Sequence, residues 1–247
     1  MSLYVYCICD ESESEAFGGA GGLGGASVRA LKFSRVAAVV GDVEDGERVA
    51  ATGENVSAHN RVCSHALASV TPLPARFGTV VTEARLAEYI AASEAALVSA
   101  LARVRGCVEM GVKVRDGSVK AKGKRQKAKE ESDEAGDEAR VEVARAGSGT
   151  AFLLAKRREI LGDESSKLRA EELAAWLDRG LAGLVRESAV RLRPSESLAV
   201  RAAHLVERAR AAEYKERVRE LSGERPGLQF LTSGPWPPYS FSETEAR

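Results

Sequence analysis

The sequence has little of what draws a protein to nucleic acid or into a membrane. Its 36 basic residues equal its 36 acidic residues, so the formal net charge is zero and no overall field attracts nucleic acid or anionic lipid. It contains no apolar run of 18 residues and no basic region followed by an apolar segment near its start. Those features mark membrane spans and secretion signals. We therefore expect a cytoplasmic protein that has neither nucleic acid nor a membrane as a partner.

Residues that bind metals or attack substrates are scarce as well. There are three histidines and four cysteines, with no Cys-x-x-Cys pair and no Cys/His spacing typical of a zinc site. His59 and His65 are six residues apart, so they do not share one face of a helix. The sequence contains no motif-grade nucleophile and no phosphate loop. We expect reduced, buried thiols, no metal, no cofactor and no enzymatic activity. The four cysteines are Cys7, Cys9, Cys63 and Cys107.

A glycine-rich segment follows the first expected strand. Six of the eight residues from Gly18 to Gly25 are glycine, which invites comparison with a phosphate-binding loop. The segment lacks the Gly-Lys-Ser/Thr ending of such loops, and a strand pattern at Val28–Phe33 stands where a helix N-terminus would be needed. A flexible connecting loop is therefore the favoured interpretation.

Residues 1–105 alternate between strand-like and helix-like hydrophobic patterns. Together these patterns predict an N-terminal α+β domain whose helices cover a face of a sheet. The expected strands are Leu3–Cys9, Val28–Phe33, Val36–Val40 and a short one within Leu73–Val80, and the expected helices run from Asn55 to before Pro72 and from Thr82 to Gly106.

Residues 106–233 predict a second α+β domain. Cys107–Arg115 alternates, with Val108, Met110, Val112 and Val114 on one side and Glu109, Lys113 and Arg115 on the other. A long helical pattern over Phe152–Arg186 follows, then strands at Ser188–Leu192 and Leu198–Val206, a helix at Glu213–Leu221 and a strand at Leu228–Leu231. This βαββαβ order is that of a ferredoxin-like fold, which by itself names no function.

A strongly charged segment interrupts this second domain. Six basic residues lie between Lys120 and Lys129, and six acidic residues lie between Glu130 and Glu138. Such a composition cannot offset its ordering entropy by burial, so we expect a disordered insertion at about 117–147. Nucleic-acid binding by the basic run is a minor alternative, because the adjacent acids neutralise it.

The chain closes with a segment, 234–247, that begins Gly-Pro-Trp-Pro-Pro-Tyr-Ser-Phe. Three prolines make it rigid and three aromatic rings give it apolar surface. It is predicted to be an extended tail, which either packs back on the domain or offers a polyproline II segment to a partner. Spacing and composition leave both alternatives open.

Leu73–Val80 reads Leu-Pro-Ala-Arg-Phe-Gly-Thr-Val. The prolines favour an entry turn, and the β-favouring residues after it favour a short strand. Arg76 is then a single charge in an otherwise apolar run. We expect its side chain to be partly buried and paired with an acid or with backbone carbonyls, so that Arg76→Ala would damage folding or a domain interface.

Taken together, several segments resemble the gas vesicle protein L/F family. The shared segments occur in the family's order and span nearly the whole chain, although Met110 stands where the family usually has an aromatic residue, and the segments Gly18–Gly25 and Lys120–Glu138 look particular to this chain. The segments that carry the resemblance are Leu3–Tyr6, His59-Asn60, Leu73–Thr79, Glu109–Lys113 and Gly234–Phe241.

The resemblance implies a non-enzymatic protein that works in the cytoplasm with gas vesicles. Its implied partners are the hydrophobic gas vesicle shell protein and other accessory proteins, and we expect an assembly chaperone that holds the shell protein in a groove between the domains. A minor component retained on the vesicle wall and a small-molecule-binding regulator are the alternatives. The motif residues expected to be structural or partner-binding are Leu73, Pro74, Arg76, Phe77, Gly78, Glu109, Lys113, Pro235, Trp236, Pro237, Pro238 and Tyr239.

Overall fold

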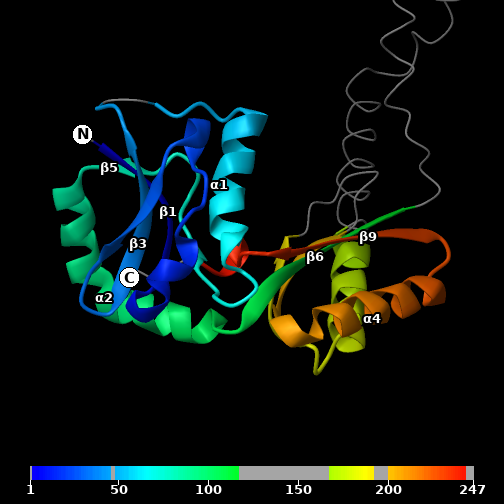
Figure 1. The fold of residues 1–247 in the computed structure, drawn as a ribbon. Helices are drawn as coiled ribbons and strands as arrows, with labels where there is room; N and C mark the ends of the chain where they lie inside the picture. The colour runs from blue at the N-terminus through cyan, green and yellow to red at the C-terminus, as the bar shows by residue number, and fades with distance from the viewer. Residues whose placement is uncertain (1, 46–47, 117–166, 192–199, 243–247) are drawn as a thin grey trace, which may run out of the picture.

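The computed structural model describes residues 2–45, 48–116, 167–191 and 200–242. Within these ranges the chain forms two β-sheets with helices packed on them, an α+β architecture (Figure 1). The charged insertion expected at about 117–147 and the start of the long helix after it lie outside the described residues. None of the helices within the described ranges combines the length and apolar character that crossing a membrane requires.

The first sheet is built around β1 (Ser2–Asp10). On one side β1 pairs antiparallel with β3 (Val36–Val43), which pairs in turn with β2 (Val28–Lys32). On the other side it pairs with two short strands, β4 (Leu73–Pro74) and β5 (Val80–Val81). The strands predicted at the start of the chain are therefore confirmed.

The segment between β4 and β5 differs from the prediction of one short strand. Phe77 and Gly78 form a turn, in which Gly78 has a φ of 83°. That backbone conformation favours glycine, and the turn carries the chain out of the sheet. Both the hydroxyl and the N–H of Thr79 donate to the carbonyl of Arg76, at 2.7 and 3.1 Å, which holds the turn closed.

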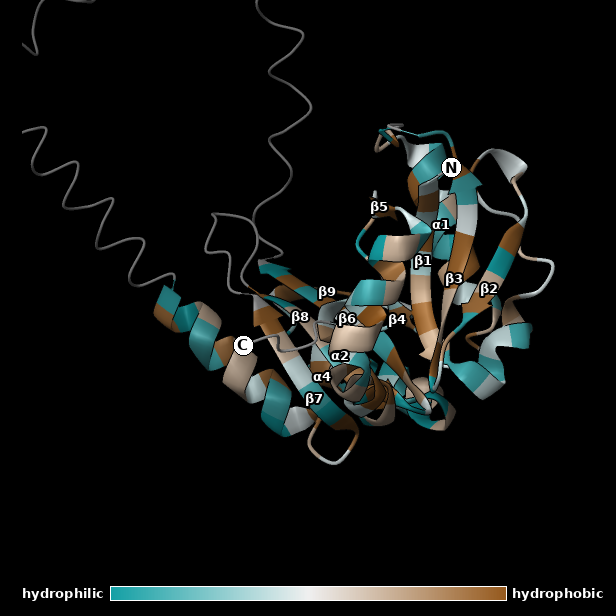
Figure 2. Ribbon diagram, turned by 90° about the vertical axis from the view of Figure 1, so that its left-hand side faces the viewer, coloured by the Kyte–Doolittle hydropathy of each residue, from teal (hydrophilic) through white to brown (hydrophobic). Residues whose placement is uncertain are grey.

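Two helices cover opposite faces of the first sheet. Helix α1 (Gly53–His65) begins after Thr52 and α2 (Glu83–Val104) after Thr82, and each threonine hydroxyl accepts a hydrogen bond from the third residue after it. Figures 1 and 2 show α1 on one side of β1 and α2 on the other. The prediction that both helices lie on one face is wrong, because β1 is apolar along nearly its whole length and needs cover on both faces. Helix α1 also ends well before Pro72.

A β-bulge in β1 sets which residues face each helix. The register with β3 shifts between Val5 and Cys7, so Tyr6 and Cys7 both pack on the α1 side while Val5 packs on the α2 side. The glycine-rich segment that contains the 3-10 helix η2 (Leu23–Gly25) lies on the α1 side too. There the N–H of Leu23 donates to the Tyr6 hydroxyl at 2.9 Å.

The second sheet has the order β7-β8-β6-β9, with every neighbouring pair antiparallel. Its helices, residues 167–180 and α4, pack on one face, which confirms the predicted alternation in β6: Val108, Met110, Val112 and Val114 are all fully buried. The bounds are β6 (Cys107–Asp116), β7 (Val185–Arg191), β8 (Val200–Glu207), η4 (Arg208–Arg210), α4 (Ala211–Glu224) and β9 (Leu228–Trp236).

The end of the chain returns from the second sheet to the first. Strand β9 continues through Trp236, so it includes the first three residues of the segment 234–247. Pro237 and Pro238 are buried, and a short 3-10 helix, η5 (Tyr239–Phe241), follows them. Phe241 is 2% exposed and belongs to the core between the first sheet and α2. In Figure 1 this red end of the chain lies at the foot of α1.

Candidate functional site

Polar contacts anchor the returning end of the chain to both sheets. The Glu109 carboxylate on β6 accepts hydrogen bonds from the backbone N–H of Ser240 at 2.7 Å and from its hydroxyl at 3.0 Å. Arg103 at the end of α2 donates to the carbonyl of Phe241 at 2.6 Å. Residues 237–241 therefore pack back on the protein, whereas Pro235 and Trp236 are exposed. Glu109 is thus placed to position the end of the chain.

An aromatic cluster joins four of the family-like segments. The Tyr4 hydroxyl lies 2.9 Å from Nδ1 of His59 and accepts a hydrogen bond from the N–H of Gly78 at 3.2 Å. The Phe77 and Tyr239 rings lie 5.8 and 6.2 Å from the His59 ring, and Tyr239 also donates to Asn60 at 3.2 Å. Burial raises the pKa of Tyr4 to about 12, so its hydroxyl keeps its proton at neutral pH.

A thiol lies at the base of the aromatic cluster. Cys63 donates to the carbonyl of Tyr6 at 3.2 Å, and its sulfur is 3.7 Å from Nε2 of His59. Burial opposes ionisation of Cys63, but hydrogen bonds from Cys7 and His59 outweigh it and lower the pKa of the thiol. A thiol beside an imidazole can serve as a nucleophile, yet Cys63 and His59 are 0% and 3% exposed. The pair is closed to substrates and stabilises the packing of α1 on β1.

All four cysteines are free and buried, as expected. Among the described residues, no three His, Cys, Asp or Glu side chains are grouped as metal ligands would be.

An apolar groove of about 820 Å³ lies beside the aromatic cluster, between α2 and the β4–β5 edge of the first sheet. We call it the motif groove, because Leu73, Pro74, Arg76 and Tyr239 of the family-like segments line it. The remaining lining residues are Val5, Ile8, Ala75, Thr79, Val81, Arg85, Leu86, Tyr89, Leu97 and Ser242. Its wall is mainly formed by the N-terminal half with two residues from the end of the chain, and it is not a cleft between the two sheets.

Arg76 is exposed on the wall of the motif groove, and the prediction of a partly buried, paired arginine is wrong. Within the described part of the chain its guanidinium has neither a carboxylate nor a carbonyl partner. The reason is the turn at residues 75–79, which takes Arg76 out of the sheet that was expected to enclose it. Its carbonyl stabilises the turn, while its side chain projects to solvent.

Arg76→Ala should therefore change the free energy of unfolding by less than about 0.5 kcal/mol, as exposed substitutions usually do. Leu73→Ala, three residues away and 3% exposed, provides the contrast and should cost about 2 to 5 kcal/mol. Urea unfolding of both variants measures the difference. A loss above about 1 kcal/mol for Arg76→Ala would contradict a purely surface position.

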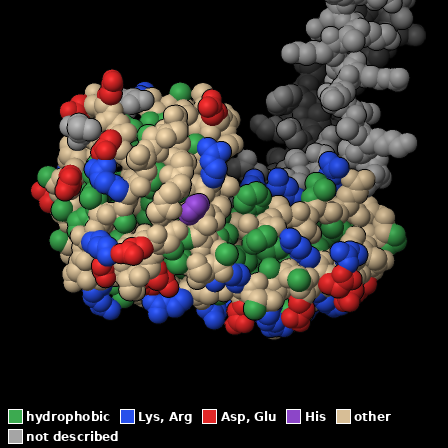
Figure 3. Space-filling model, viewed as in Figure 1, with side chains coloured by type: hydrophobic (Ala, Val, Ile, Leu, Met, Phe, Trp, Pro, Cys, Tyr) green, Lys and Arg blue, Asp and Glu red, His purple; other side chains and the backbone are tan. Residues whose placement is uncertain are grey.

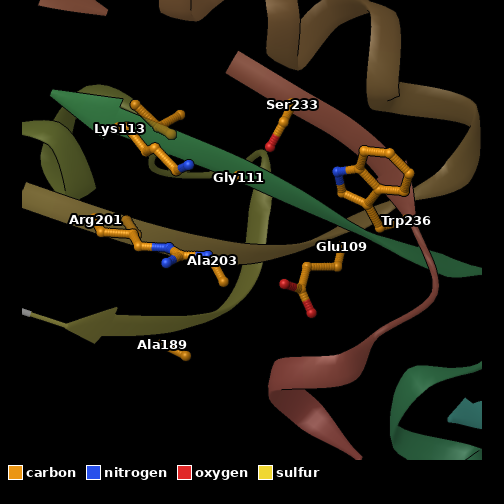
Figure 4. Close-up of a pocket in the computed structure, with 10 residues that line it drawn as sticks. Glu109, Gly111, Lys113, Ala189, Arg201, Ala203, Ser233 and Trp236 are labelled. Atoms are coloured by element: carbon orange, nitrogen blue, oxygen red, sulfur yellow. The ribbon is translucent and has the colours of Figure 1, made fainter. Parts of the chain in front are cut away.

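A second depression crosses the open face of the second sheet (Figure 4). We call it the sheet trough. Gly111 pairs with Ala203 on one side and Ser233 on the other, and Ala203 pairs with Ala189, so small residues cross all four strands in one row. A β-carbon on Gly111 would lie 2.6 Å from the Ser233 hydroxyl, so a larger residue there would require that hydroxyl to rotate away.

Motif residues border the sheet trough. Lys113 and Arg201 lie on one side of the small-residue row, and Glu109 and Trp236 lie on the other (Figure 4). The trough measures about 150 Å³, far less than the motif groove. Seven of the twelve predicted site residues therefore line one of these two surfaces, whereas Phe77, Gly78, Pro235, Pro237 and Pro238 line neither. The motif groove is the one large enough for several side chains of a partner. Basic and acidic side chains are interspersed over the face shown in Figure 3.

Some residues of this region escaped the sequence reasoning. Ser240 and Phe241 were expected only as part of a tail, and the contact of Tyr4 with His59 was not expected. The available signal was that these residues stand in the family-like segments. Polar side chains from distant segments that are buried together need hydrogen-bond partners, so contacts among these segments could have been expected.

Comparisons with known proteins give a consistent result. The family model described as gas vesicle synthesis protein GvpL/GvpF matches residues 2–243. Gas vesicle protein L of Streptomyces sp. (strain CB03234) is 30% identical over 260 residues, covering 97% of this chain and 92% of that protein. Gas vesicle protein F2 of Halobacterium salinarum is 27% identical, covering 97% of this chain and 91% of that protein.

Solved structures show the same fold. The crystal structure of GvpF from Anabaena sp. PCC7120 matches with a TM-score of 0.72 at 20% identity, covering 98% of this chain and 96% of that one. The crystal structure of GvpF from Microcystis aeruginosa matches with a TM-score of 0.68 at 16% identity, covering 98% and 99%. At these identities the likeness concerns the fold.

Proposed function

The chain belongs to the gas vesicle synthesis protein GvpL/GvpF family, and we propose that it acts in gas vesicle formation by binding the hydrophobic shell protein before the shell is assembled. In this role it is a non-enzymatic assembly factor that works in the cytoplasm beside the growing vesicle. Other accessory proteins of the gas vesicle are its further partners.

The motif groove is the observation that supports this role. A shell subunit whose assembled surface faces gas exposes apolar area before assembly, and such area causes aggregation. A binding protein needs an apolar surface of its own that is open to solvent. The motif groove offers one, because Ala75, Val81 and Tyr239 in its lining are partly exposed and Tyr89 is 49% exposed.

Co-expression with the shell protein tests the proposal. We expect the tagged protein to capture the shell protein and to keep it in the supernatant after centrifugation, and we expect a deletion strain to form fewer vesicles or none. Absence of capture together with normal vesicles in the deletion strain would refute the role. Immunoblots of washed, floated vesicles separate a transient factor from a retained wall component, since only the latter stays at a fixed ratio to the shell protein.

We also propose that residues 1–105 and 106–233 are separate domains and that the second is ferredoxin-like. Supporting this assignment, the second half has the element order β6, helix 167–180, β7, β8, α4, β9, and its sheet order is β7-β8-β6-β9 with both helices on one face. In ferredoxin-like domains two split βαβ halves give an antiparallel sheet of this kind.

A further inference from the structure

We propose that the motif groove takes an amphipathic helix that carries carboxylates beside its apolar stripe. In naming the shell protein as the source of that helix, the inference rests on the function proposed above. The site itself rests on the shape, the lining and the charge of the groove.

The lining of the motif groove suits an apolar stripe. Leu73, Leu86 and Leu97 are at most 4% exposed, and they form a fixed floor because they also belong to the core between the first sheet and α2. The two tyrosines in the lining, Tyr89 and Tyr239, are of a residue type that is enriched among the energetically dominant residues of protein interfaces. The volume of about 820 Å³ is comparable with that of small-molecule pockets, roughly 300 to 1,000 Å³, so the groove has room for several side chains of a bound helix.

The charge of the motif groove selects an acidic partner. Arg76 and Arg85 line it, and no aspartate or glutamate does. Both arginines are exposed, and among the described residues neither guanidinium has an acidic partner. Carboxylates on a bound segment would form charge-assisted hydrogen bonds with these two guanidinium groups, whereas lysines at the same positions would be repelled.

The edge of the sheet at the motif groove favours a helix over an added strand. Strand addition requires a continuous row of free backbone groups. Here β4 and β5 are two residues each and are separated by the turn, Pro74 has no N–H, and the N–H of Thr79 is already donated to the carbonyl of Arg76 at 3.1 Å. A helix satisfies its own backbone and presents only side chains, so it fits this edge better.

Two synthetic peptides test the site directly. Both are 16-residue helices with leucine at the i, i+3, i+4, i+7 positions, and one carries glutamate beside the stripe where the other carries lysine. By fluorescence anisotropy we expect the wild-type protein to bind the glutamate peptide at least tenfold more tightly than the lysine peptide, and Arg76→Glu/Arg85→Glu to reverse that preference. The control variant Arg179→Glu/Lys215→Glu makes the same charge change on the helices of the second sheet and should bind like the wild type.

Equal binding of the glutamate peptide by the wild type and by Arg76→Glu/Arg85→Glu, both with the same urea midpoint, would overturn the proposal. The proposal would also be overturned if the glutamate peptide bound only after the chain had been truncated after Ser242. The residues that follow Ser242 would then be the occupant of the groove.

Capture of the shell protein separates this inference from the proposed function. If the wild type and Arg76→Glu/Arg85→Glu capture the shell protein equally, the inference fails and the proposed function stands. If neither captures it while the glutamate peptide binds the groove with the expected preference, the proposed function fails and the acidic-helix site stands. Loss of capture in Arg76→Glu/Arg85→Glu, restored by replacing acidic residues of the shell protein with lysine, supports both.

Discussion

Phe241→Ala is expected to destabilise the protein by about 3 to 5 kcal/mol, the usual cost of removing a buried phenylalanine. Phe241 is 2% exposed and packs in one core with residues of β1, β3 and α2. Its removal leaves a cavity where the end of the chain meets the first sheet. It also weakens the hold on η5, whose position depends on Glu109 and Arg103. Urea unfolding followed by circular dichroism measures the effect.

Trp236→Ala is the matched control. Trp236 is a larger aromatic residue in the same terminal segment, but it is 42% exposed on the open face of the second sheet, so its removal should cost at most about 1 kcal/mol. If Phe241→Ala lowered the free energy of unfolding no more than Trp236→Ala does, Phe241 would not be part of the core between the first sheet and α2.

Stability should fall as the pH is lowered from about 6.5 to about 4, because of His204. This histidine in β8 is fully buried. Its Nδ1 lies 2.6 Å from the Tyr214 hydroxyl, and its Nε2 is 3.7 Å from the carboxylate of Asp178, beyond hydrogen-bonding distance. Burial lowers the pKa of His204 to about 4, against the opposing effect of Asp178.

The direction follows from which state binds the proton. The unfolded chain protonates this histidine near its ordinary pKa of about 6.5, whereas the folded protein does so only near pH 4. The contribution of His204 to the free energy of unfolding is therefore complete above pH 6.5. It is lost progressively between pH 6.5 and 4, by about 3 kcal/mol in total. His204→Gln should reduce the slope of unfolding free energy against pH in this window. His65→Gln, on an exposed histidine, should leave the slope unchanged, and equal slopes for both variants would contradict the prediction.

Regular patterns allowed most of the fold to be predicted from sequence. The alternation in β6 places Val108 inside and Lys113 outside, because a strand with one covered face leaves a period of two. In contrast, β1 has no such period since both of its faces are buried. Its apolar run predicted a buried strand correctly and also implied cover on both faces, which the prediction of helices on one face did not take into account.

The candidate site was less predictable because it depends on a turn and on contacts between distant segments. Arg76 looked like a buried charge only while Phe77 and Gly78 were taken to continue a strand. The left-handed conformation of Gly78 reverses that conclusion, and glycine is compatible with either geometry. Likewise, the bonds of Glu109 to Ser240 join residues 131 positions apart, and no local pattern encodes such a pairing.

The position of Phe241 in the first core also has a consequence for protein synthesis. Domains generally fold from the N-terminus as the chain leaves the ribosome, but this core contains Leu3 and Phe241 together and cannot close until residue 241 has been synthesised and released. During that interval the α2 face of β1 stays partly uncovered on the nascent chain. A fragment ending at residue 105 would keep the same exposed face permanently, so recombinant fragments of the first half should retain residues 237–241 by fusion.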